Sequence, residues 1–172
     1  DKIITLIIRD EAYLNHKFSK DWSYHDYRDG EVDDYLEACK KLTDLGYYVF
    51  RMGEIVKKKI NITDNSKIID YATNGMRTEL LDIYLAKKSF FCISNSTGWD
   101  ALPQIFRRPI LFSNYTPFGS ISTFSKQFMF TTRHHFSKKL NRKLSLKEIF
   151  ENGLSNASRK ENYTDKNVVL LN

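Results

Sequence analysis

The residues with the clearest chemical potential are arginines, carboxylates and small polar residues that directly follow short apolar runs. They are Arg9, Asp10 and Glu11 after the first run, Arg51 and Gly53 after the second, Asp70 and Tyr71 after the third, Ser94, Asn95, Ser96, Thr97 and Gly98 after the fourth, and Asn114 after the fifth. An arginine can grip phosphate oxygens through two parallel N–H bonds, which a lysine cannot do. The pattern therefore predicts a site for an anionic ligand.

The segment 94–98 is predicted to be a turn from a strand into a helix that cradles this anion. Backbone N–H groups at a helix start lack intrahelical partners, and the hydroxyls of Ser96 and Thr97 add further donors. Gly98 allows a ligand to approach the backbone closely. In isolation, simple helix capping by Ser96 or Thr97 explains the same residues equally well.

The two arginines also have a structural alternative. A salt bridge with a nearby acidic residue, of which the candidates are Asp10, Asp70 and Asp82, explains Arg9 or Arg51 alone at least as well as ligand binding does. Their joint placement at neighbouring strand ends, together with the turn, favours the ligand.

Short apolar runs alternate along the chain with helical periodicities, and these elements must position the site. Strands are predicted at 3–8, 47–50, 67–71, 90–93 and 109–112, and helices at 31–45, 77–87 and 98–106. Alternation with short connections implies parallel strands joined by right-handed crossovers. We predict one α/β domain over residues 1–172, with a doubly wound, mainly parallel sheet of about five strands. In such a sheet the ligand crevice lies beyond the carboxyl ends of the strands.

Two parts of the chain lack this regularity. Residues 10–30 show no clean period and are predicted to form a long functional loop. From Tyr115 we expect a loop to residue 127, then a short strand at 128–132. A helix is expected from Ser145, where Ser-Leu-Lys-Glu resembles a capping box.

Composition indicates an ordinary globular protein and narrows its partners. Hydrophobic residues make up 41% and charged residues 28% of 172, and no apolar stretch reaches the roughly 20 residues of a membrane helix. The formal charge is +6, and much of the excess lies in Lys126, Arg133, Lys138, Lys139, Arg142, Lys143 and Lys147. Such a segment fits a solvated face, a nucleic acid or an anionic membrane surface.

The remaining residue patterns do not single out a function. Cys39 and Cys92 fit buried thiols in a reducing compartment, and no Cys or His pair has metal-ligand spacing, so no metal site is expected. The phosphate-binding glycine loops and the serine-hydrolase elbow are not found in the sequence. Aromatic residues that could stack on a base or a sugar, although most aromatics only pack, are Tyr13, Trp22, Tyr24, Tyr27 and Trp99.

A set of short motifs runs along nearly the whole chain. It comprises Ile8-Arg9-Asp10 with Tyr13, Tyr27-Arg28-Asp29, Gly46-Tyr47-Tyr48-Val49-Phe50-Arg51-Met52-Gly53, Asp70-Tyr71-Ala72, Glu79-Leu80-Leu81-Asp82-Ile83-Tyr84-Leu85, Ser96-Thr97-Gly98, and Pro109 with Asn114. In this combination the chain resembles a group of bacterial glycosyltransferases that are distantly similar to protein O-fucosyltransferases and core fucosyltransferases. Each piece is weak alone, and the combination is fairly specific.

The resemblance implies the carboxyl-terminal, donor-binding half of an enzyme with two Rossmann-like halves (a GT-B-type fold). The chain is therefore expected to be part of a longer protein whose amino-terminal half binds the acceptor. In the related fucosyltransferases an arginine after a strand holds the donor's diphosphate, and Arg9 matches that role. Ser96-Thr97 matches the turn that completes the phosphate cradle. Those enzymes usually carry a His two residues before the arginine, where this chain has Ile7, so the donor's base is left open.

The expected activity is metal-independent, cofactor-free sugar transfer from a nucleotide sugar to a glycan or lipid-linked acceptor, in surface polysaccharide or lipopolysaccharide synthesis. The expected catalytic residues are Arg9, Asp10 and Glu11. The expected donor-binding residues are Arg9, Arg51, Gly53, Asp70, Tyr71, Asp82, Ser94, Asn95, Ser96, Thr97 and Gly98, with Asp70 or Asp82 near the base or supporting the cradle. The expected location is the cytoplasm, with peripheral contact at the inner face of the membrane. Alternatives are a non-catalytic module for a nucleotide or phosphorylated ligand and, less favoured, nucleic-acid binding through residues 126–147.

Overall fold

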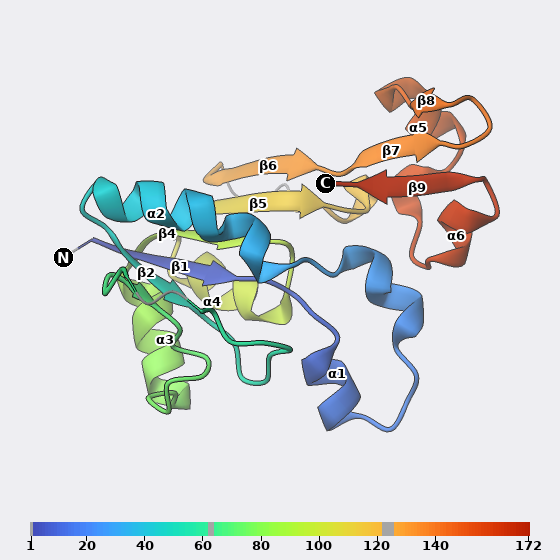
Figure 1. The fold of residues 1–172 in the computed structure, drawn as a ribbon. Helices are drawn as coiled ribbons and strands as arrows, with labels where there is room; N and C mark the ends of the chain where they lie inside the picture. The colour runs from blue at the N-terminus through green and yellow to red at the C-terminus, as the bar shows by residue number, and fades with distance from the viewer. Residues whose placement is uncertain (1, 62–63, 122–125) are drawn as a thin grey trace.

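A six-stranded sheet forms the centre of the computed structural model, which describes residues 2–61, 64–121 and 126–172 (Figure 1). Its strands are β1 (Ile3–Ile7), β2 (Tyr48–Arg51), β3 (Ile68–Ile69), β4 (Ser89–Ser94), β5 (Ile110–Tyr115) and β6 (Phe128–Thr132). They lie in the order β3-β2-β1-β4-β5-β6, and all neighbours are parallel. This is the strand order of a doubly wound, Rossmann-like sheet. The predicted α/β fold is confirmed, with one strand more than expected because β6 joins the sheet.

Helices cover both faces of this sheet (Figure 1). One face carries α2 (Leu36–Asp44), which continues from the 3-10 turn η2 (Val32–Tyr35). The other carries α3 (Glu79–Lys88) and α4 (Ala101–Ile105), the latter preceded by η3 (Gly98–Asp100). Thr78 caps α3 by accepting a hydrogen bond from the Leu81 backbone N–H, and α2 ends before Gly46, whose φ of 89° suits glycine.

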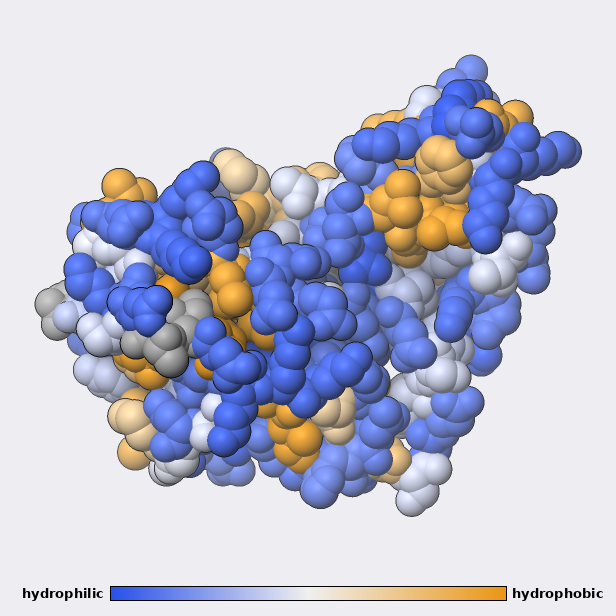
Figure 2. All heavy atoms as spheres, viewed as in Figure 1, coloured by the Kyte–Doolittle hydropathy of each residue, from blue (hydrophilic) through white to orange (hydrophobic). Residues whose placement is uncertain are grey.

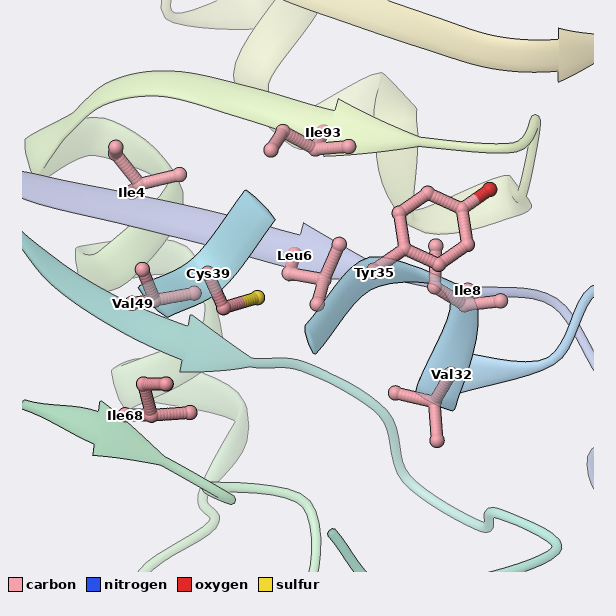
Figure 3. Packing of buried hydrophobic residues seen from close by; sticks show 9 residues of the cluster. All are labelled: Ile4, Leu6, Ile8, Val32, Tyr35, Cys39, Val49, Ile68 and Ile93. Carbon is pink, nitrogen blue, oxygen red and sulfur yellow. The ribbon is translucent and has the colours of Figure 1, made fainter. Parts of the chain in front are cut away.

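The core under α2 is built from the strand residues that point to that face. Ile4, Leu6, Val49 and Ile93 pack against Cys39 and the other residues shown in Figure 3. A second core on the opposite face joins Ile7 and Cys92 to α3. Because β1 is buried on both faces, its continuous apolar run is explained. Both cysteines are buried free thiols, and burial raises the pKa of Cys39 to about 11.

Several predicted boundaries shift. The stretch 10–30, predicted as a loop, contains α1 (Ala12–Lys17) and the 3-10 helix η1 (Ser23–Arg28). The predicted strand 67–71 pairs only over Ile68–Ile69, and β5 runs past Asn114 instead of ending before it. Part of the predicted loop 115–127 forms η4 (Phe118–Ser120), and its residues 122–125 lie outside the described chain.

The chain then leaves the parallel sheet and builds a carboxyl-terminal module, residues 134–172 (Figure 1). Its antiparallel sheet has the order β8-β7-β9, with β7 His134–Ser137, β8 Arg142–Lys143 and β9 Val168–Leu171. Three short helices complete it, α5 (Leu146–Glu151), η5 (Leu154–Asn156) and α6 (Glu161–Thr164). The capping box predicted at Ser145 is confirmed, with Glu148 as its partner. In the part of the chain that the structure describes, no helix has the length and apolar character to cross a membrane.

Candidate functional site

The carboxyl ends of β1 and β4 lie side by side at the point where the chain changes faces. Ile7 pairs with Ser94, the chain after β1 leads to α2 on one face, and the chain after β4 leads to α4 on the other. Diverging connections at such a switch point leave a crevice outside the sheet. Arg9 and the turn 94–98 therefore meet, as the sequence predicts.

Arg9 is fixed on its inner side and open on its outer side. Its backbone N–H donates to Asn95 Oδ1 at 2.6 Å, and its carbonyl accepts from the Gly30 N–H at 2.9 Å. The guanidinium Nε donates to Asp29 Oδ1 at 2.8 Å. No acceptor among the described residues engages its terminal Nη1 and Nη2 atoms. The side chain is 15% exposed, and its two Nη groups can therefore donate parallel hydrogen bonds to a phosphate.

The turn 94–98 is capped internally, which corrects part of the cradle prediction. Ser96 has a φ of 77°, and its N–H donates to Ser94 Oγ at 3.0 Å. The Thr97 N–H donates to Asp100 Oδ2 at 2.7 Å in a capping box, so the capping alternative holds for Thr97, whereas the Ser96 N–H is bonded within the turn and does not cap the helix. The Gly98 and Trp99 N–H groups have no acceptor within the described chain, and the space beside Gly98 is open. Because the helix that follows is short, its dipole adds little to the site.

Two further arginines converge behind Arg9. Arg28 donates from Nη2 to the carbonyl and the hydroxyl of Ser96 at 3.1 and 3.0 Å. Arg133, which lies between β6 and β7, donates from Nη1 to the Tyr27 carbonyl at 2.7 Å and from Nη2 to the Asp29 carbonyl. Burial lowers the pKa of both arginines, and Arg9 lowers that of Arg28 further. Neither side chain lines the two cavities beside Arg9, so these arginines add buried positive charge behind Arg9, which favours an anion there.

Asp29 is the counter-ion at the centre of this group. It pairs with Arg9, yet burial raises the pKa of its carboxyl to about 6, more than the arginine lowers it. A carboxylate with this pKa holds its charge at neutral pH against a desolvation penalty. The negative charge next to Arg9 is thus held at an energetic cost, as is that of Asp100, whose pKa burial also raises to about 6.

An aromatic cavity opens on one side of Arg9. It has a volume of about 630 Å³ and lies between the strand ends and α1. Its lining comprises Arg9, Asp10, Tyr13, Phe18, Trp22, Gly53, Glu54, Arg77, Asp82, Thr97, Gly98 and Trp99 together with apolar neighbours. The indole Nε1 atoms of Trp22 and Trp99 are buried without a hydrogen-bond partner in the described chain. Both indole Nε1 atoms are shielded from solvent, so it is the aromatic surfaces of this cavity that fit a planar ring such as a nucleobase, by stacking.

An acidic cavity of about 500 Å³ opens on the other side of Arg9. Arg9, Leu14 and Trp22 line both cavities. The acidic cavity is otherwise polar, with Glu11, Asn15, Asp21, Ser23, Asp26, Asp29, Glu31, Lys57 and Asn172 among its lining residues. Its carboxylates can accept hydrogen bonds from several hydroxyl groups at once.

Arg51 and Asp70 lie inside the fold instead of at the crevice. Arg51 is 1% exposed, and its Nη1 lies 3.1 Å from Asp70 Oδ1. The second oxygen of Asp70 accepts from the Ile60 N–H and the Thr73 hydroxyl. This geometry is the salt-bridge alternative for Arg51, which presents no exposed donor to a ligand.

Tyr71 and Asp82 support the amino-terminal end of α3. Tyr71 is fully buried and donates to Asp82 Oδ1 at 2.9 Å, while Arg77 pairs with Asp82 Oδ2 at 2.9 Å. The ion pair orients Arg77 at the wall of the aromatic cavity. The sequence reasoning missed Arg77, although its place just before the helix cap Thr78, beyond the third strand, was a usable signal.

Asp10 and Glu11, which were expected to be catalytic, both form hydrogen bonds or ion pairs within the chain. Asp10 accepts hydrogen bonds from the backbone N–H groups of Ala12 and Lys57 at 2.9 and 3.0 Å. Glu11 pairs with Lys57 Nζ at 3.1 Å, and hydrogen bonds to its own backbone and to Lys57 lower the pKa of its carboxyl. A lowered pKa makes Glu11 a weaker base at neutral pH.

No group of His, Cys, Asp and Glu within residues 2–61, 64–121 and 126–172 is arranged to hold a metal ion. The sequence matches no protein-family model and no curated protein, and the structure matches no solved structure. The fold and the crevice are therefore the features that bear on function.

Proposed function

We propose that this chain is the donor-binding part of a metal-independent, nucleotide-sugar-dependent glycosyltransferase of the GT-B type. The observation that carries the proposal is the position of Arg9 at the switch point, with free Nη donors between an aromatic and an acidic cavity. A nucleotide sugar has the same order of parts: a planar base, a diphosphate, and a sugar rich in hydroxyl groups.

In this arrangement each part of the donor meets matching chemistry. The base stacks in the aromatic cavity on Trp22 and Trp99, and the diphosphate binds Arg9 and the free N–H groups at Gly98 and Trp99. The transferred sugar lies in the acidic cavity. As the glycosidic bond breaks, Arg9 stabilises the charge that develops on the leaving diphosphate, which is catalysis by preplaced donors.

A thermal-shift and calorimetry panel tests this function. Ligands that bind only the folded state raise its apparent stability, so the preferred nucleotide sugar is expected to shift the transition more than inorganic phosphate does. Arg9→Ala is expected to abolish that shift, while Arg107→Ala, a change at an exposed arginine beyond α4, leaves it intact. Unchanged binding by Arg9→Ala would remove the basis of the proposal.

A non-catalytic module for nucleotides or phosphorylated ligands is the second candidate. The hydrogen bonds of Asp10 and the ion pair of Glu11 favour this binding module, because a carboxylate with such partners is a weak general base. In the first proposal the base is supplied by the acceptor-binding part of the enzyme. Donor hydrolysis or transfer that depends on Arg9 distinguishes the enzyme from a module that binds without turnover. A cytoplasmic location, where both thiols stay reduced, is part of the same proposal.

A further inference from the structure

The antiparallel sheet of the carboxyl-terminal module has one covered and one uncovered face. His135 and Ser137 of β7 and Val168 of β9 are buried toward α5 and α6, and side chains alternate along each strand. Phe136, paired with Val169, therefore lies on the opposite face. We call this the uncovered sheet face; it comprises His134, Phe136, Lys143, Val169 and Leu171. Figure 2 shows hydrophobic side chains gathered over β7 and β9, with hydrophilic ones around them.

The centre of the uncovered sheet face is apolar. Phe136 and Val169 are partly exposed, and Leu171 is 40% exposed. The turn between β7 and β8 adds Leu140, which is 49% exposed. Neither Phe136 nor Leu171 belongs to a buried cluster of the described residues.

Three exposed lysines from the most basic part of the chain lie at the rim of this face. Residues 126–172 contain ten Lys and Arg and four Asp and Glu, so they carry the whole formal charge of +6. Lys143 lies opposite Phe136 in the sheet, and Lys138 and Lys139 follow β7 directly. All three are exposed, and no acidic side chain of the described chain pairs with them. Arg142, by contrast, is held by Glu148.

We infer that the uncovered sheet face docks on the surface of an anionic phospholipid bilayer. Lysines beside an anionic surface gain Coulomb attraction, and apolar side chains between them gain by entering the boundary between headgroups and acyl chains. A nucleic acid could pair with the lysines and stack a base on Phe136, but it would gain nothing from the aliphatic side chains of Val169, Leu171 and Leu140, which a bilayer surface accommodates.

Docking through this face also places the crevice at the membrane. Leu171 of the face is followed by Asn172, which lines the acidic cavity and donates to Asp34 at 3.0 Å. The acidic cavity is therefore next to the docked surface, where a lipid-anchored substrate would be presented.

Co-sedimentation of the full chain with vesicles tests the inference. Phosphatidylcholine vesicles containing phosphatidylglycerol are expected to bind the chain, and vesicles of phosphatidylcholine alone are not. The triple variant Lys138→Gln, Lys139→Gln, Lys143→Gln is expected to bind on the order of a hundredfold more weakly, from about fivefold per lysine. The matched control changes Lys40, Lys41 and Lys87 to Gln, and these lysines are exposed on α2 and α3. An equal loss in the control, or no binding to anionic vesicles, overturns the inference.

A tryptophan reporter shows whether the sheet face itself makes the contact. Phe136→Trp is expected to shift its emission to the blue on anionic vesicles, relative to the parent chain. Tyr84→Trp, at a half-exposed position on α3, is expected to keep its spectrum. An unchanged Phe136→Trp spectrum, or oligonucleotides that displace the chain from vesicles through the same three lysines, contradicts membrane docking. Nucleotide-sugar binding is expected to be equal in all these variants, so failure here leaves the proposed function untouched.

Discussion

Asp29→Asn is expected to stabilise the fold at neutral pH, although it removes the charged partner of Arg9. In the unfolded chain this carboxyl titrates near 3.8, and in the folded chain its pKa is about 6. Between these values the folded state holds a proton that the unfolded state has lost, so stability falls as pH rises through the interval. Keeping Asp29 ionised at pH 7 therefore costs the folded state about 3 kcal/mol. The uncharged amide that Asp29→Asn introduces is expected to avoid most of this cost, because its oxygen still accepts a hydrogen bond from Arg9 Nε.

The same substitution is expected to tighten binding of a nucleotide sugar. Asp29 Oδ1 lies 2.8 Å from Arg9 Nε, so a phosphate on the Nη atoms would sit roughly 6 Å from the carboxylate. At an effective dielectric constant of about 20, that repulsion is up to about 3 kcal/mol, and solvent screening reduces it. We therefore expect the dissociation constant to fall about tenfold or more at pH 7.5.

The pH dependence of affinity is the sharper measurement. Calorimetric titration with a nucleotide sugar, whose phosphate diesters stay ionised, is expected to show tighter binding by the parent chain at pH 5.5 than at pH 7.5. Asp29→Asn is expected to show no such change. Asp26→Asn, which removes an exposed charge from the same cavity, is the matched control. Weaker binding by Asp29→Asn, or an identical gain in the control, would refute the view that Asp29 restrains Arg9.

Three further changes separate recognition from folding. Arg133→Met removes two hydrogen bonds to backbone carbonyls and is expected to lower the free energy of unfolding in urea by about 1.5 to 3 kcal/mol. It is also expected to weaken donor binding, whereas Arg107→Met is expected to change neither quantity. Phe18→Ala, at a side chain 49% exposed, is expected to weaken nucleotide-sugar binding by about tenfold while leaving inorganic pyrophosphate binding unchanged; equal losses for both ligands would place the base elsewhere. Arg51→Met removes the buried partner of the ion pair with the partly buried Asp70 and is expected to cost about 3 to 5 kcal/mol. The remaining folded protein is expected to bind the donor normally, as separate unfolding and binding titrations would show.

The parallel sheet was predictable because most of its strands are short, nearly continuous apolar runs, of which β1 is buried on both faces. The short helix α1 was not, since it buries no residue and therefore has no apolar period. The strand β7 was missed for the opposite reason. Its inward residues are the polar His135 and Ser137, and its outward residues are His134 and Phe136, so it lacks the alternation of buried apolar and exposed polar residues that predicts a strand.

For the site, the sequence located the strand ends but not the long-range contacts. The rule that ligands bind beyond the carboxyl ends of strands led directly to Arg9 and the turn 94–98. Asp29 and Arg133 could not be placed in the same way, because they meet Arg9 through loops that no local pattern specifies. Which N–H groups of the turn are free depends on Asp100, three residues further along, and that required the structure.

Arg9 and Arg51 show why a strand-end arginine is not enough to define a site. Each lies at the carboxyl end of its strand, and each pairs with an aspartate 20 or 19 residues further along the chain. Arg51 lies beside β1 and away from β4, and Asp70 and its backbone contacts enclose it. Arg9 lies between β1 and β4, where the diverging connections leave two cavities, so one edge of its guanidinium stays accessible. The same sequence pattern therefore gives a structural ion pair at Arg51 and a candidate ligand-binding residue at Arg9. The difference is that Arg9 lies at the switch point of the sheet and Arg51 does not.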